Sequence, residues 1–154
     1  MGRYRLVKPG ELENGIEQLA RRLAVPRAIL VLIDADDDCP AELGPSLLAR
    51  AAEARPDIAI GIVLAKREFE AWFLAAVESL AGRRSLPKEV DPIADPESVR
   101  NAKGVLTHLM PPRTAYSERA DQPALTAVFD MEAARSRSDS FDKCYREIER
   151  LLTT

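Results

Sequence analysis

Two short aliphatic runs, Ile29–Ile33 and Ile58–Leu64, limit what this chain can fold into more than any other feature. The first run has no alternation of apolar and polar residues, so a strand formed from it is buried on both faces. Such strands are typical of parallel sheets that helices cover. Segments with helical spacing separate the two runs. The sequence therefore predicts an α/β fold with a small parallel sheet and right-handed crossovers.

The first half of the chain is expected to form this α/β core. We predict three strands, at Tyr4–Val7, Ile29–Ile33 and Ile58–Leu64, and three helices, from Pro9 to Ala24, from Pro40 to about Arg55 and from Lys66 to Gly82. Pro40 suits the first position of its helix, and Gly82 suits the end of the third. The apolar faces of the first two helices include Leu19 and Leu48.

The second half is expected to be helical. A cap, a proline and an acid at Asp95-Pro96-Glu97 predict a helix start, and Pro111-Pro112 ends that helix. One or two short helices follow, with Asp130 as a cap, before a last helix at Phe141–Leu152. We predict one domain over residues 1–154, with an α/β core at 1–82 and a helical part at 95–154 packed on it.

Composition excludes several classes of protein. The formal charge of −3 argues against a generally basic nucleic-acid coat, although a local basic groove and a nucleic-acid partner stay open. Two cysteines, Cys39 and Cys144, are too few for a disulfide framework, so a cytoplasmic location is the default. We expect no signal peptide and no membrane partner, because the longest apolar run, Ala28 to Ile33, is too short to span a bilayer.

Four aspartates follow the first aliphatic run within five positions, in "DADDD". Ligands of open parallel sheets bind at the carboxyl ends of strands. Asp34, Asp36 and Asp38 are placed there, and residues two apart in an extended chain point the same way, which leaves Asp37 aside. Close carboxylates repel unless a cation neutralises them, and such ligands suit Mg²⁺ or Mn²⁺. We predict a divalent-metal site; the alternative is a solvated strand end in which Asp38 caps the next helix.

Glu70 is a further candidate, as a metal ligand or catalytic acid. A helical wheel places it in the buried sector with Phe73 and Val77, whereas Glu68 and Glu78 fall outside. The helix start should lie at the same edge of the sheet as Asp34. Glu70 is expected to reach the metal or a water on it; the alternative is a carboxylate satisfied by the N–H groups of its own helix start.

Weaker candidates surround these acids. Lys66 and Arg67 precede Glu70 and could hold a phosphate; the alternative is a solvated rim. His108 has no nucleophile partner in view and is interpreted as a surface or satisfied residue. Ser138 and Ser140 are interpreted mainly as caps of the last helix, with anion binding as the alternative. The chain has no glycine-rich phosphate loop.

Several segments together resemble a bacterial family of unknown function with a toprim-like core: "ILVLIDADDDCP", "VLAKREFEAWFLAAVESL", "KG" at Lys103-Gly104, "DQPALTAVFD" and "SFDK". The "FEAW" of Phe69–Trp72 is also similar to a motif in toprim proteins of abortive phage infection. In the toprim fold, which overcoming-lysogenization-defect nucleases share, an Asp-x-Asp pair binds Mg²⁺. The resemblance implies that Asp34 and Asp36 form this pair, with Asp38 as a third acid, and that the substrates are phosphodiesters.

One segment departs from the toprim pattern. Toprim domains begin with a strand that ends in a glutamate acting as general acid/base, and neither Glu11 nor Glu13 matches that position. The resemblance therefore implies that this chain starts at the second strand and that catalysis is impaired more than metal binding. It also implies an uncovered strand edge, for which we expect a homodimer or a partner that supplies the missing strand.

Three functions follow as alternatives. The first is an enzyme, a toprim-like nuclease that uses Mg²⁺ or Mn²⁺ for phosphodiester cleavage, with a role in phage defence. The second is a non-catalytic metal-binding or regulatory module that lacks the general acid/base. The third is a haloacid-dehalogenase-like phosphatase, which also begins with Asp-x-Asp after a hydrophobic strand, although Asp38 stands where that class has threonine or valine.

Overall fold

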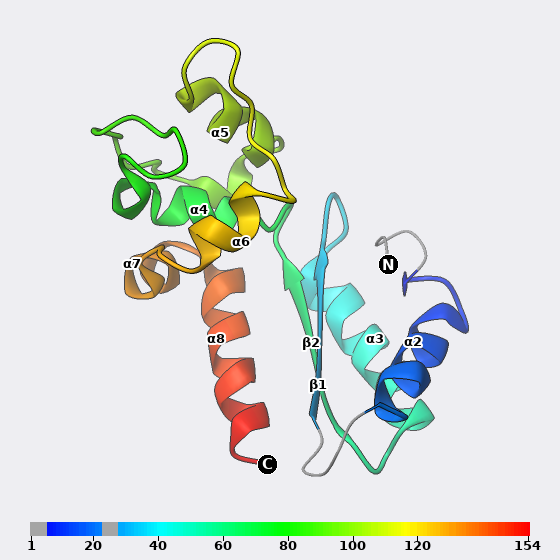
Figure 1. The fold of residues 1–154 in the computed structure, drawn as a ribbon. Coiled ribbons are helices and arrows are strands. Elements are labelled where there is room, and N and C mark those ends of the chain that lie inside the picture. The colour runs from blue at the N-terminus through cyan, green and yellow to red at the C-terminus, as the bar shows by residue number, and fades with distance from the viewer. Residues whose placement is uncertain (1–5, 23–27) are drawn as a thin grey trace. The chain divides into compact units, whose positions relative to one another are not determined.

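A computed structural model of the chain describes residues 6–22 and 28–154 (Figure 1). The chain divides into two compact units, residues 1–64 with 143–154 and residues 65–142. The first unit holds the sheet, and the second consists of short helices and loops. This division falls earlier than the expected boundary after Gly82, and it groups the end of the last helix with the sheet. That all 154 residues act as one domain stays a prediction.

The first unit is built on a two-stranded parallel sheet. β1 (Ala28–Asp34) pairs with β2 (Ala59–Ala65), α3 (Pro40–Ala54) connects them, and α2 (Glu11–Ala20) precedes them. Parallel strands need a crossover connection, which α3 supplies. The prediction of a parallel α/β core is confirmed, and Pro40 does occupy the first turn of its helix.

The core of this unit lies between the sheet and the helices α2 and α3. Alternate residues of β2, from Ile60 to Leu64, are buried together with Leu47 and Ala51 of α3. From α2, Leu12 and Ile16 join the same cluster. Leu19 and Leu48 were expected to face inward, but their exposed fractions are 48% and 38%. The apolar sector of each helix is therefore narrower than the sequence pattern predicts.

The opposite face of β2 is covered by the end of α8 (Asp139–Leu152), as Figure 1 shows. A Cβ built on Gly61 would lie 2.7 Å from Oε1 of Glu147, closer than real contacts allow. Arg150 reaches the same strand and donates a hydrogen bond of 2.8 Å to the carbonyl of Ile60. Glycine at position 61 thus lets α8 approach the sheet.

The predicted strand at Tyr4–Val7 is wrong for its described part. Tyr4 and Arg5 lie outside the described residues, as do Leu23 of the predicted first helix and Pro26, which was expected to end it. Leu6 is helical, and Val7 lies in a turn. The carbonyl of Val7 accepts a hydrogen bond of 3.0 Å from Arg50 of α3. A side chain thus takes the carbonyl that a strand would direct to its neighbour.

Arg50 links the start of α2 to α3. Its guanidinium donates to both carboxylate oxygens of Glu13, at 2.7 and 2.9 Å, and to the carbonyls of Val7 and Lys8. The hydrogen bond from Arg50 lowers the pKa of Glu13. Bidentate arginine–carboxylate pairs combine charge with fixed geometry, so this cluster positions α2 against α3.

We predict that Arg50→Ala lowers the free energy of unfolding by about 2 kcal/mol, because it removes a bidentate ion pair and leaves two carbonyls without their donor. Arg21→Ala is the control: Arg21 pairs with Glu17, but its side chain is 75% exposed, so its loss should cost no more than about 0.5 kcal/mol. Urea denaturation at neutral pH measures both.

The same contact predicts a pH dependence. The folded pKa of Glu13 is depressed, so its stabilising effect is present above the unfolded pKa, about 4.3, and is lost as the pH falls through the folded pKa. The deficit of Arg50→Ala relative to the natural chain should therefore shrink below about pH 4. A deficit that stays constant down to acid unfolding would show that the ion pair does not stabilise the fold.

The second unit is helical, as predicted. Its elements are α4 (Ala71–Ala75), the 3₁₀ helices η1 (Val77–Leu80) and η2 (Pro96–Ser98), α5 (Ala102–Leu109), α6 (Asp121–Thr126), α7 (Met131–Arg137) and the start of α8. Asp130 caps α7 and accepts hydrogen bonds from the N–H groups of Glu132 and Ala133. This cap and the two short helices were both predicted. In the described part of the chain, no helix combines the length and apolar character that crossing a membrane requires.

Two helices of this unit differ from the prediction. The helix expected from Lys66 to Gly82 is only α4 followed by η1, and every residue from Ala71 to Val77 is buried. A segment buried on all sides follows its packing rather than an amphipathic period. The helix expected to start at Pro96 forms one 3₁₀ turn, and α5 begins at Ala102 because Asn101 caps it through the N–H of Gly104.

Aromatic packing holds the centre of the second unit. Trp72 and Phe73 are 2% and 0% exposed, and five rings form a chain of contacts with centroids 4.9 to 5.7 Å apart: Phe69, Trp72, Phe73, Phe129 and Phe141. Edge-on ring pairs add to the burial energy. These rings are therefore core residues rather than a platform for stacking bases.

Candidate functional site

The acidic segment after β1 lies in the first unit and forms a turn. β1 ends at the half-buried Asp34, Ala35 is fully buried, and Asp36, Asp37 and Asp38 are exposed. The N–H of Asp38 donates a hydrogen bond of 3.0 Å to the carbonyl of Ala35. Asp36 has a φ of 50°, in the left-handed region where aspartate is one of the tolerated residues.

This turn corrects one premise of the sequence analysis. The chain is not extended from Asp34 to Asp38, so the alternation that grouped Asp34, Asp36 and Asp38 and set Asp37 aside does not hold past Ala35. Asp37 is therefore as plausible a ligand as its neighbours. The residue at the cap position of α3 is Cys39 rather than Asp38.

The carboxylates suit a hard cation in chemistry, but they are not arranged as a closed cage. Within residues 6–22 and 28–154, no group of three His, Cys, Asp or Glu side chains is placed to hold a metal ion. Mg²⁺ often takes only one or two protein carboxylates and keeps several waters. Binding of Mg²⁺ or Mn²⁺ at this turn stays a prediction.

Glu70 lies in the second unit and is 0% exposed, as the helical wheel predicts. Its side chain does not cap its own helix, so that alternative is wrong. Oε1 instead accepts hydrogen bonds from the Tyr116 hydroxyl, at 2.9 Å, and from Nε2 of Gln122, at 3.0 Å. Nζ of Lys103 lies 3.8 Å from Oε2. These partners belong to three separate segments, so Glu70 joins α5, α6 and the loop between them to α4.

The electrostatics of this cluster keep the Tyr116 hydroxyl neutral. Burial raises the pKa of Tyr116, and the hydrogen bond to Glu70 raises it further. Tyr116 therefore stays protonated and donates its hydrogen bond. Lys103 also lies 2.6 Å from Glu118, which places its ammonium between two carboxylates. A buried carboxylate needs such donors, because an unpaired buried charge is costly.

Glu97 is a buried acid that sequence reasoning did not find as part of a site. It is 6% exposed and lies at the start of α8, where its Oε1 accepts hydrogen bonds from the Ser138 hydroxyl, at 2.7 Å, and the N–H of Ser140, at 3.0 Å. Ser138 also accepts from the N–H of Phe141. The expected serine cap is thus present, and the anion at this helix start is a side chain of the chain itself.

Lys66 and Arg67 lie at the beginning of the second unit. The N–H of Lys66 donates to the Ser140 hydroxyl at 3.1 Å, and its exposed side chain places Nζ 3.9 Å from Oε2 of Glu97. Arg67 is half-buried and has a φ of 67°. Lys66 therefore has an internal carboxylate beside it, and the phosphate-binding role of both residues stays a prediction. His108 is exposed, as expected for a surface residue.

The predicted site residues fall in both units. Asp34, Asp36 and Asp38 belong to the first, whereas Glu70 and the Lys66-Arg67 pair belong to the second. Within the second unit, Glu70 and Lys66 lie in separate clusters, around Tyr116 and around Glu97. The second unit therefore holds two separate clusters, one around Glu70 and one around Glu97. A joint site of Asp34 with Glu70 stays a prediction.

Comparison with known proteins identifies the family. The family model described as "Domain of unknown function (DUF4276)" matches residues 7–149. The chain belongs to the DUF4276 family. No curated protein and no solved structure matches the chain. The matched residues include α2, the acidic turn and the buried Glu70 and Glu97. All candidate site residues therefore lie inside the family's domain.

We predict that Glu70→Gln lowers the free energy of unfolding by about 1–3 kcal/mol, because the neutral amide weakens the hydrogen bond from Tyr116 and removes the ion pair with Lys103. Glu68→Gln is the matched control: Glu68 is half-buried and accepts one bond of 3.3 Å from the N–H of Lys103. Its effect should stay near 0.5 kcal/mol. Chemical denaturation measures both variants.

A double-mutant cycle of Glu70→Gln with Tyr116→Phe measures the coupling between these two side chains. It separates their hydrogen bond from a general loss of stability. If Tyr116 and Glu70 act together, the two changes cost less in combination than their sum, by about 1 kcal/mol or more. Additive effects would show that Glu70 is not held by this hydrogen bond. Glu70→Gln should also impair any metal-dependent activity more than Glu68→Gln.

Proposed function

We propose that this DUF4276 chain binds Mg²⁺ or Mn²⁺ at the acidic turn after β1 and acts on phosphodiesters, in the manner of a toprim-like nuclease. Asp34 and Asp36 are the principal ligands, and Asp37 or Asp38 adds a further carboxylate. A bound divalent ion would supply charge neutralisation of a phosphate and activation of water. The observation that carries the proposal is the place of this turn, directly at the carboxyl end of the parallel strand β1.

Physical chemistry supports this place for a cation. Ligand sites of open α/β sheets lie outside the carboxyl ends of their strands, where loops can vary without disturbing the core. The segment from Asp34 to Asp38 concentrates four carboxylates in five residues. These carboxylates repel one another, and a bound cation relieves the repulsion. Asp36 adopts a left-handed conformation, which is uncommon outside glycine and recurs at ligand-binding turns.

A non-catalytic metal-binding module is the second candidate. The observation that favours it is the environment of Glu70, whose carboxylate is fully buried and bound by Tyr116 and Gln122. A group held in this way stabilises the second unit and is poorly placed to exchange protons with a substrate. In this candidate the acidic turn binds the cation, and recognition of a partner replaces cleavage.

We predict that Mg²⁺ or Mn²⁺ raises the melting temperature of the chain and that Asp34→Asn or Asp36→Asn removes the rise. A ligand present at about ten times its dissociation constant adds about 1.4 kcal/mol, which for a chain of this size is about 3–6 °C. Asp91→Asn is the control, because Asp91 is an exposed aspartate in a loop of the other unit. A melting temperature indifferent to millimolar metal would contradict the metal site.

Nuclease assays distinguish the two candidates. The chain is incubated with single- and double-stranded DNA in Mn²⁺, and Asp34→Ala serves as the inactive control. Cleavage that requires both the metal and Asp34 supports the enzyme. Metal binding without cleavage supports the binding module, and cleavage that survives Asp34→Ala contradicts both.

A further inference from the structure

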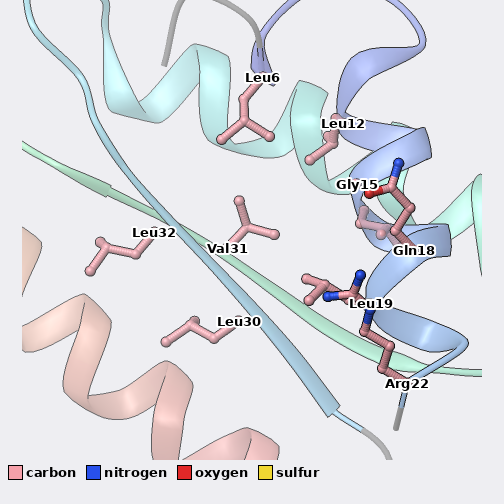
Figure 2. Close-up of a pocket in the computed structure, with 10 residues that line it drawn as sticks. Leu6, Leu12, Gly15, Gln18, Leu19, Arg22, Leu30, Val31 and Leu32 are labelled. Carbon is pink, nitrogen blue, oxygen red and sulfur yellow. The ribbon is translucent and has the colours of Figure 1, made fainter. Parts of the chain in front are cut away.

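A hollow of about 390 Å³ lies beside β1 in the first unit (Figure 2). Three consecutive residues of β1, Leu30, Val31 and Leu32, line it. Figure 2 shows Leu30 and Leu32 on one side of the strand and Val31 on the other. Because successive side chains point to opposite faces, a hollow that touches all three wraps around the edge of the strand.

This edge faces away from the other strand of the sheet. Within residues 6–22 and 28–154, the sheet consists of β1 and β2 alone, so one edge of β1 pairs with β2 and the hollow borders the other. Aliphatic side chains flank it on β1 and α2, and Leu19 of α2 is 48% exposed there. A strand edge with apolar flanks is a template for another strand.

We propose that a second copy of this chain pairs with this edge, β1 against β1 in antiparallel register, to form a dimer with one continuous four-stranded sheet. The pairing is isologous, since the same edge of both copies meets about a two-fold axis near Val31. The two rows of backbone N–H and C=O groups then bond to each other, and the two hollows are filled by the aliphatic side chains of the facing copy.

The distribution of charge along β1 favours antiparallel pairing with a second copy. Arg22 lines the hollow, and Figure 2 shows it nearer to Leu30 than to Leu32, that is, toward the start of β1. The acidic turn follows Asp34, where β1 ends. Ala28 and Asp34 each lie three residues from Val31, about 10 Å along the strand. Antiparallel pairing about Val31 therefore brings Arg22 of each copy to the acidic end of the other. Parallel pairing would instead align arginine with arginine and acid with acid.

The dimer does not rest on the proposed metal chemistry and is measured without metal, by sedimentation equilibrium of the chain in EDTA. We expect a reversible dimer. Leu19→Lys and Arg22→Glu should each raise its dissociation constant about tenfold, because each change acts twice in a symmetric interface. The matched controls are Leu48→Lys and Arg21→Glu, which make the same changes at exposed positions that do not line the hollow. Melting curves confirm that all four variants fold.

Hydrogen exchange locates the interface. The amides of residues 29–33 should exchange faster when the chain is diluted below the dissociation constant, while those of β2 stay protected. A chain that is monomeric at all concentrations, or a dimer that Leu19→Lys and Arg22→Glu leave unchanged, would overturn the proposal. So would a monomer with protected β1 amides, which would mean that the edge is covered within the chain, or a monomer that retains an apolar small molecule in native mass spectrometry.

Discussion

The parallel pairing of β1 with β2 is the constraint on which the first unit depends. Two parallel strands require a helical crossover between them, and the fully buried β2 requires cover on both faces. α3 supplies the crossover and one cover, and the end of α8 supplies the other because Gly61 has no side chain to keep it away. The same pairing fixes where β1 ends, and therefore where the acidic turn meets solvent.

The second unit is organised by buried carboxylates as well as by its aromatic core. Glu70 and Glu97 each bring together segments far apart in the sequence: Tyr116, Gln122 and Lys103 for Glu70, and Ser138, Ser140 and Lys66 for Glu97. A third buried acid, Asp121, lies 2.7 Å from Nε of Arg84 and accepts from the N–H of Ser117 at 2.8 Å. Buried charges persist only where donors surround them, so these contacts determine how the short helices pack.

The sequence predicted what local patterns encode. Aliphatic runs predicted both strands of the sheet, and Pro40 predicted the start of α3. Asp130 was correctly predicted to cap α7, and the helical wheel correctly predicted that Glu70 is buried. It could not predict the donors around Glu70 and Glu97, which lie 31 to 52 residues away and follow no periodicity. It also failed where packing overrides local preference, in the break between α4 and η1, and where a side chain takes a backbone partner, as Arg50 does at Val7.

The central claim is that the acidic turn binds a divalent cation, and paramagnetic broadening by Mn²⁺ in an NMR spectrum tests it most directly. Mn²⁺ broadens the signals of nuclei near it, so substoichiometric Mn²⁺ reports the location of the ion residue by residue. Our account predicts selective loss of the amide signals from Ala35 to Cys39, reversed by excess Mg²⁺. Broadening centred on Glu118 and the exposed loops of the second unit, or none at the turn, would contradict it.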